Sequence, residues 1–206
     1  MTNVMNHREQ RRAETLEKIY WAGMQLFGEK GYGNTTVYAI ARRARIAQRT
    51  FFTYYASKKD ILFAVPEEYC DILIDQMMNK SITTQTVPLF RSFLTNILTT
   101  PPPTYFVASD AQVYRIIFRS PELQDYVNAM KRRVIDAIAY AFAQDMRVTI
   151  DDYRAIIAAE TLVNSFWIAG GALFPYERQY SQQSIDNYFH LLEDVLGVIR
   201  EEIATD

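Results

Sequence analysis

Residues 35–59 read TTVYAIARRARIAQRTFFTYYASKK. Two short segments with a helical apolar period fit this stretch, residues 37–44 after the capping hydroxyl of Thr36 and residues 47–55 after a tight turn. The apolar residues that the two segments would share are Ile40, Ala41, Ala44, Ile46, Phe51 and Tyr55. Two short helices with one small core and a tight turn between them predict a helix-turn-helix.

The same packing leaves polar side chains on the outside of the second helix. They are Gln48, Arg49, Thr50, Thr53 and Tyr54. A guanidinium and an amide near the start of a protruding helix suit hydrogen bonds to base edges in the major groove of DNA. An ordinary corner between two helices fits the spacing as well, so charge is a useful second observation. Residues 1–60 hold 11 Lys and Arg against 5 Asp and Glu, whereas the whole chain has a net charge of −2. A cationic segment on an anionic chain favours a polyanionic partner.

Helical signals continue on both sides of this stretch. An apolar period runs from residue 9 to residue 30 and stops at Gly31 and Gly33. Further helices are predicted over residues 57–78, 120–145, 151–174 and 181–203, and Pro101, Pro102 and Pro103 break the chain between them. No segment alternates as a strand does. The sequence therefore predicts an all-α fold.

Composition narrows the possible classes of protein. The 206 residues are 49% apolar, which is enough for a packed core. One cysteine and two histidines exclude a disulfide framework and leave little for a metal site, so no cofactor is expected. Sequence motifs of hydrolases and nucleotide-binding enzymes are missing, which disfavours an enzyme. No apolar segment of the signal-peptide kind follows the charged first residues, and we expect a cytoplasmic protein.

Residues 8–70 resemble the DNA-binding domain of TetR-type transcriptional regulators. The resemblance is carried by TTVYAIA at 35–41, IAQRTFFTYY at 46–55 and SKKDIL at 57–62, with FGEKGY at 27–32 closing the preceding helix. It implies a three-helix DNA-binding domain over residues 1–56 and a helical ligand-binding and dimerisation domain over residues 57–206. It also implies a ligand-inducible homodimeric repressor on a pseudo-palindromic operator in double-stranded DNA.

The resemblance further implies roles for single residues. Gln48, Arg49 and Thr53 would face base edges, while Lys58 and the start of its helix would hold a phosphate. The full set of expected DNA-binding residues is Thr36, Tyr38, Arg45, Gln48, Arg49, Thr50, Thr53, Tyr54 and Lys58. The basic residues before them, Arg8, Arg11 and Arg12, occupy the place of the family's N-terminal arm.

Three positions depart from the family's pattern. Ala47 replaces the hydroxyl residue that usually caps the recognition helix, and Phe52 replaces a tyrosine whose hydroxyl would reach a phosphate. Arg45 replaces the glycine of the turn. Either Arg45 adopts a positive φ at a cost of about 1 kcal/mol, or the turn differs from that of the family.

The C-terminal part of the chain is expected to form the dimer. Residues 154–175 are apolar nearly all round, so this helix should contact both its own core and another surface. A membrane span is the competing interpretation, but Glu160 and Asn164 interrupt the segment, and we expect no membrane. Together with the apolar stripe over residues 181–203, it resembles the four-helix dimer interface of the family. The expected interface residues are Val163, Phe166, Gly170, Leu192, Leu196 and Ile199.

Aromatic and methionine side chains gather in the middle of the chain. They form either ordinary core or an apolar cavity with polar groups, suited to a small apolar or aromatic effector. The expected ligand-binding residues are Tyr69, Phe93, Tyr114, Phe118, Tyr126, Met130, Glu160, Asn164 and Trp167. Glu160 is alternatively paired with an internal arginine such as Arg133. A helical carrier of apolar ligands without DNA activity would share this cavity, and duplex binding distinguishes the two functions.

Overall fold

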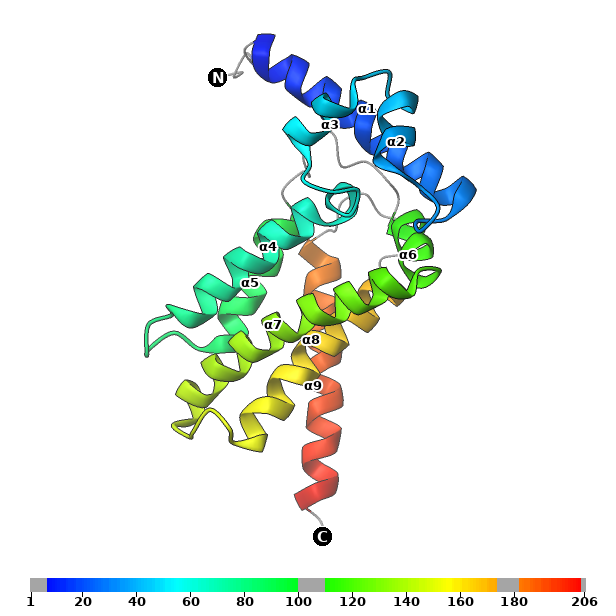
Figure 1. Ribbon diagram of the computed structural model, residues 1–206. Helices are drawn as coiled ribbons and strands as arrows, with labels where there is room; N and C mark the ends of the chain where they lie inside the picture. Colours follow the sequence, from blue (N-terminus) through cyan, green and yellow to red (C-terminus); the bar gives the residue numbers. More distant parts are fainter. Residues whose placement is uncertain (1–6, 100–109, 174–181, 205–206) are drawn as a thin grey trace. The chain divides into compact units, whose positions relative to one another are not determined.

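A computed structural model describes residues 7–99, 110–173 and 182–204 (Figure 1). Within these ranges the regular elements are α-helices and no residue is in a strand, which confirms the all-α prediction. The helices are α1 (His7–Lys30), α2 (Val37–Arg43), α3 (Gln48–Tyr54), α4 (Asp60–Met78), α5 (Thr86–Thr99), α6 (Asp110–Phe118), α7 (Pro121–Met146), α8 (Tyr153–Leu173) and α9 (Gln182–Ala204).

The chain divides into two compact units. The first takes in residues 1–68 and 102–127, and the second takes in residues 69–101 and 128–206. The first unit therefore extends past the expected boundary at residue 56 and includes α6. Helices α4 and α7 each contribute residues to both units.

In the first unit, α1 supplies most of the core beneath the two short helices. Ile19, Met24 and Phe27 of α1 are buried, as are Ile40 of α2 and Phe51 of α3. Gly23 of α1 leaves room for the Ile61 side chain of α4, which would have to shift if this residue carried a Cβ atom. A Cβ atom at Gly23 would lie 2.8 Å from the Ile61 Cδ1 atom, which is nearer than packed carbon atoms come.

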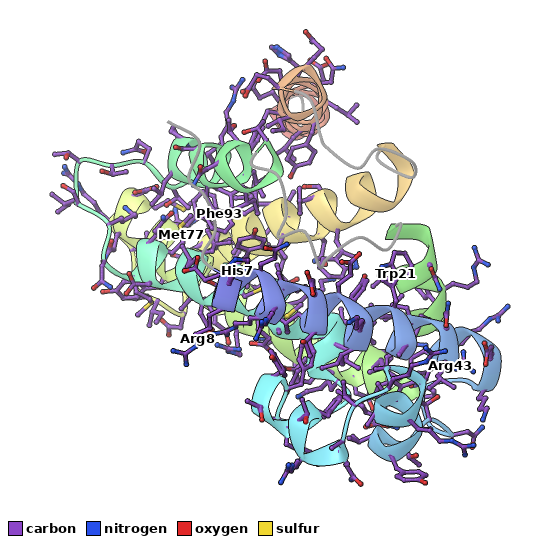
Figure 2. The ribbon with its side chains drawn as sticks, turned by 90° about the horizontal axis from the view of Figure 1, so that it is seen from above. His7, Arg8, Trp21, Arg43, Met77 and Phe93 are labelled. Atoms are coloured by element: carbon purple, nitrogen blue, oxygen red, sulfur yellow. The ribbon has the colours of Figure 1, made fainter. Side chains whose placement is uncertain are left out.

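The second unit has a core of its own, formed by the end of α4 and by α5, α7, α8 and α9. Met77 and Phe93, labelled in Figure 2, lie in this core. Aromatic rings make up part of it, with Phe90 edge-on to Phe166 and to Phe189 at centroid distances of 6.2 and 6.5 Å. Among the described helices, none combines the length and apolar character that a membrane span requires.

A buried ion pair joins the loop between α4 and α5 to helix α7 in the second unit. The Lys80 Nζ atom lies 2.6 Å from the Asp145 Oδ1 atom, and the two side chains expose 0% and 10% of their surface. The second carboxylate oxygen of Asp145 accepts a hydrogen bond of 2.8 Å from the backbone N–H of Thr86, the first residue of α5. The N-terminus of α5 is therefore capped by a side chain from α7.

Candidate nucleic-acid interface

The turn between α2 and α3 keeps the conformation of a glycine turn, although it contains an arginine. Arg45 has a φ of +57°, so the first of the two alternatives for this residue is the correct one. Its backbone N–H donates to the carbonyl of Arg42 at 3.2 Å, and the N–H of Ile46 donates to the carbonyl of Ala41 at 3.0 Å. This pair of bonds is a Schellman motif, which satisfies the last carbonyls of α2 and fixes where α3 starts.

Helix α2 begins as predicted, and α3 begins without a side-chain cap. The Thr36 hydroxyl accepts a hydrogen bond of 3.1 Å from the N–H of Ala39. Ala47 offers no such bond, so α3 starts with only the backbone carbonyl of Ala47, which accepts from the N–H groups of Thr50 and Phe51. Packing instead holds α3 in place, because the side chain of Phe51 is completely buried.

Most of the predicted DNA-binding side chains lie on the surface of the first unit. Those classed as exposed are Thr36, Tyr38, Arg45, Gln48, Arg49 and Thr53, whereas Thr50, Tyr54 and Lys58 are partly buried. The three expected base-reading residues, Gln48, Arg49 and Thr53, are thus all exposed on one short helix. The predicted basic arm is helical from the start of α1, with Arg8, Arg11 and Arg12 exposed.

Lys58 is held by the protein itself. Its Nζ atom donates to the backbone carbonyls of Tyr32 at 2.8 Å, Thr35 at 3.0 Å and Gly33 at 3.5 Å. The ammonium also lies 4.1 Å from the centroid of the Tyr32 ring. Burial raises the pKa of Tyr32 to about 12, assisted by the nearby carboxylates of Glu122 and Asp60. An ammonium has three protons, and here each has a carbonyl within 3.5 Å. These contacts give Lys58 a structural role, and its phosphate contact stays a prediction.

We expect Lys58→Met to lower the free energy of unfolding by about 1–2 kcal/mol, because hydrogen bonds from a partly buried charged group are lost. Urea unfolding followed by circular dichroism measures this change. Lys18→Met is the matched control, since Lys18 is exposed on α1. Unchanged stability together with weaker binding to every DNA sequence would favour the phosphate role instead.

A groove that the sequence analysis did not predict lies along α1 and the turn after α2. Its volume is about 530 Å³, and Figure 2 labels two of its lining side chains, Trp21 and Arg43. Arg43 forms a bidentate ion pair with Glu29 at 2.9–3.0 Å and also donates to the Gln25 side chain at 3.2 Å. Trp21 could have indicated this groove in the sequence. It lies on the same face of α1 as the polar residues Glu17, Lys18 and Gln25 and exposes 36% of its surface.

The expected ligand-binding residues are distributed over both units. Tyr126 and Phe118 belong to the first unit, and Phe118 exposes 70% of its surface rather than lining an enclosed space. Tyr114 lies on α6, and its side chain is outside the described part of the structure. In the second unit, Phe93 and Met130 are buried, whereas Tyr69, Glu160, Asn164 and Trp167 are partly exposed. The effector site stays a prediction.

Glu160 pairs with a different arginine from the one predicted. The Arg132 Nη1 atom lies 3.3 Å from the Glu160 Oε1 atom, while Arg133 pairs with Asp71. The correction follows from the helical period, because neighbouring residues of α7 face different directions. Glu160 also accepts from Asn164 at 2.7 Å, and the Asn164 carbonyl oxygen accepts from Lys131 at 2.8 Å. Lys131 was missed because only tertiary packing brings it to Asn164.

Two expected dimer residues are packed inside the protomer. Val163 and Leu192 each expose 7% and belong to the core of the second unit, and Phe166 packs against that core. These residues therefore contribute to the protomer's own core, and their place in a dimer interface stays a prediction. Gly170 lies on α8, and Leu196 and Ile199 lie on α9, but their side chains are outside the described part of the structure. In the described parts of these helices, the exposed large apolar residues are Tyr153, Ile156, Ile157 and Leu191.

Known proteins with a similar sequence or structure include several transcriptional regulators. A helix-turn-helix regulator from Mycobacterium bovis is 35% identical over 66 residues, which cover 32% of this chain and only 30% of that relative. MftR from Mycobacterium tuberculosis, whose name assigns it to mycofactocin biosynthesis, is 28% identical over 85% of this chain and 84% of its own. Among solved structures, a transcriptional regulator from Aquifex aeolicus has a TM-score of 0.55 at 16% identity, covering 90% of this chain and 99% of its own. SmeT from Stenotrophomonas maltophilia, the repressor of a multidrug efflux pump, has a TM-score of 0.50 at 18% identity over 88% and 91% of the two chains.

The two short helices, the tight turn and the exposed α3 form a helix-turn-helix, a motif with which DNA-binding proteins place a helix in the major groove. Residues 19–65 match the family model described as bacterial regulatory proteins, tetR family. This match covers the helix-turn-helix part of the chain, which is α2 and α3 with parts of α1 and α4.

Proposed function

We propose that the chain is a sequence-specific DNA-binding transcriptional regulator, a ligand-inducible dimeric repressor of a pseudo-palindromic operator. The observation that supports this most directly is the placement of the side chains of α3. Phe51 anchors the helix in the core, and Gln48, Arg49 and Thr53 stand exposed on its outside. Such a helix suits insertion into the major groove, where amide and guanidinium groups distinguish base pairs. A carrier of apolar ligands has no use for this surface, so the regulator is the better-supported function.

Dimerisation follows from the size of the reading helix. Seven residues from Gln48 to Tyr54 contact too few base pairs to define an operator alone. The exposed apolar side chains of α8 and α9 are available for a partner protomer, with Tyr153 exposing 70%, Ile157 59% and Leu191 52%. Two-fold symmetry would then make the operator a pseudo-palindrome.

A response to an effector requires a mechanical link to the reading helix, and α4 supplies one. Two residues of its first half, and Lys59 immediately before it, contact Tyr126 of α7. The Tyr126 hydroxyl donates to Glu67, its ring centroid lies 4.9 Å from that of Phe63, and the Lys59 Nζ atom lies 3.5 Å from the ring centroid. Because α4 and α7 both continue into the second unit, a displacement there would reach the first unit through these contacts. A ligand acts in this way only if it binds the two states with different affinity.

The test is selection of the full-length protein on random duplex DNA, followed by footprinting of the enriched site. We expect a pseudo-palindrome protected on one face of the duplex, with half-sites about 34–36 Å apart or a multiple of that distance. Adding small apolar or aromatic compounds to the footprint then tests the inducer. An asymmetric site occupied by single protomers would contradict the dimer, and the absence of any enriched site would contradict the proposed function.

A further inference from the structure

Phe52 is an apolar side chain exposed on the DNA-reading helix. It exposes 52% of its surface, while its neighbour Phe51 exposes none. The two rings meet edge-on, with centroids 5.5 Å apart and planes at 85°. The Phe52 ring is therefore supported by a core residue and held at the surface. No hydroxyl is present, so this side chain has nothing to donate to a phosphate oxygen.

The place of Phe52 on α3 puts it beside the polar reading residues. It follows Gln48 by four positions and Arg49 by three, and residues at these spacings are neighbours on a helix surface. The three side chains thus form one strip, in which Gln48 and Arg49 supply hydrogen bonds and Phe52 supplies an apolar face. Thymine is the base that presents an apolar group in the major groove, the C5 methyl, and aromatic side chains pack against it.

We propose that Phe52 is a specificity-determining residue that contacts the C5 methyl group of a thymine in each half-site. The inference rests on the proposed function, because it requires α3 to lie in the major groove. Contact with the methyl would remove exposed apolar surface from both the ring and the base, which is favourable in water. The half-site would then contain a thymine next to the base pair that Gln48 or Arg49 reads.

The experiment removes only the methyl group. Each thymine of the selected site is replaced in turn by uracil, which keeps every hydrogen-bonding group, and binding of the full-length protein is measured by fluorescence anisotropy. We expect one uracil position per half-site to weaken binding about fourfold, the effect of about one buried methylene-sized group. At the other thymines the ratio of affinities for thymine and uracil should stay near one.

The variants then assign the methyl contact to one residue. Phe52→Ala should bind the thymine site more weakly and bring the affinity ratio at that position from about four to about one, which is the loss of one methyl contact. Trp21→Ala is the matched control, because Trp21 is an aromatic residue of α1 that exposes 36% and is not among the expected DNA-binding residues. It should keep the ratio of the unmodified protein. Circular dichroism checks that both variants fold, as expected for exposed positions.

The outcomes separate this inference from the function on which it rests. An enriched site whose thymines all tolerate uracil, or a thymine preference that persists in Phe52→Ala, would overturn the role of Phe52 and leave the regulator intact. A library that yields no enriched site would overturn both.

Discussion

Replacing Asp145 with alanine is expected to lower the free energy of unfolding by about 3–5 kcal/mol, because it leaves a buried ammonium without its carboxylate. The side chain of Lys80 is fully buried, and its other described acceptor is the Thr84 carbonyl at 3.0 Å. The same substitution removes the acceptor for the N–H of Thr86 at the start of α5. Urea unfolding followed by far-ultraviolet circular dichroism measures the loss.

The matched control is Asp136→Ala on the same helix. Asp136 exposes 65% of its side chain and pairs with Arg132 at 3.3 Å. Exposed pairs of this kind contribute little, so we expect a change of about 0.5 kcal/mol or less. Similar losses for the two variants would show that the pair of Lys80 and Asp145 contributes no more than a surface pair.

The stabilising effect of Asp145 also depends on pH. Burial by itself raises the pKa of this carboxyl, but hydrogen bonds from Lys80 and Thr86 outweigh burial, and the pKa in the folded chain is lowered from 3.8. A lowered folded-state pKa means that the contribution is present above the unfolded-state pKa and is lost as pH falls through the folded-state value. The stability difference between the unmodified protein and Asp145→Ala should therefore shrink below about pH 4.

Arg49→Ala is expected to cost about 1–3 kcal/mol of binding free energy at one base position, which is roughly a 5- to 150-fold loss of affinity. Arg49 is exposed near the start of α3, and its guanidinium presents two parallel donors suited to the edge of guanine. Titration of the selected site, of its single-base variants and of random duplex by fluorescence anisotropy locates the affected base.

Arg49→Lys provides the control that keeps the charge. A lysine ammonium lacks the planar, bidentate geometry of arginine, so affinity for random duplex should be kept while discrimination at the one base is lost. If Arg49→Ala weakens the selected site and random duplex equally, Arg49 contacts the backbone rather than a base.

Local signals were sufficient for the helix-turn-helix and for the longer helices α1, α4, α7, α8 and α9, but they missed α5 and α6. The Thr36 cap and the apolar period placed α2 and α3 to within about two residues of the structure. Helix α5 was not predicted, because its N-terminus is capped by Asp145, which lies 59 residues further along the chain. No local pattern reports such a contact.

The side chains of the candidate site show the same limit. Exposure of Gln48, Arg49 and Thr53 follows from the helical period once Phe51 is placed in the core. The carbonyl contacts of Lys58 span 23–26 residues, so its sequence neighbours could not indicate them. An apolar stripe likewise does not indicate whether it packs against the protomer's own core or against a partner. Val163 and Leu192 pack in the core of their own protomer.

At least three of the 11 cationic side chains in residues 1–60 are already occupied within the protein. Lys58 binds backbone carbonyls, Arg43 binds Glu29, and Lys59 lies over the ring of Tyr126. Duplex DNA gives up its condensed counterions only to cations that reach its phosphates, and the number released sets how steeply affinity falls with salt. A side chain held elsewhere in the fold releases none. The formal charge of residues 1–60 thus overstates the dependence of DNA affinity on ionic strength.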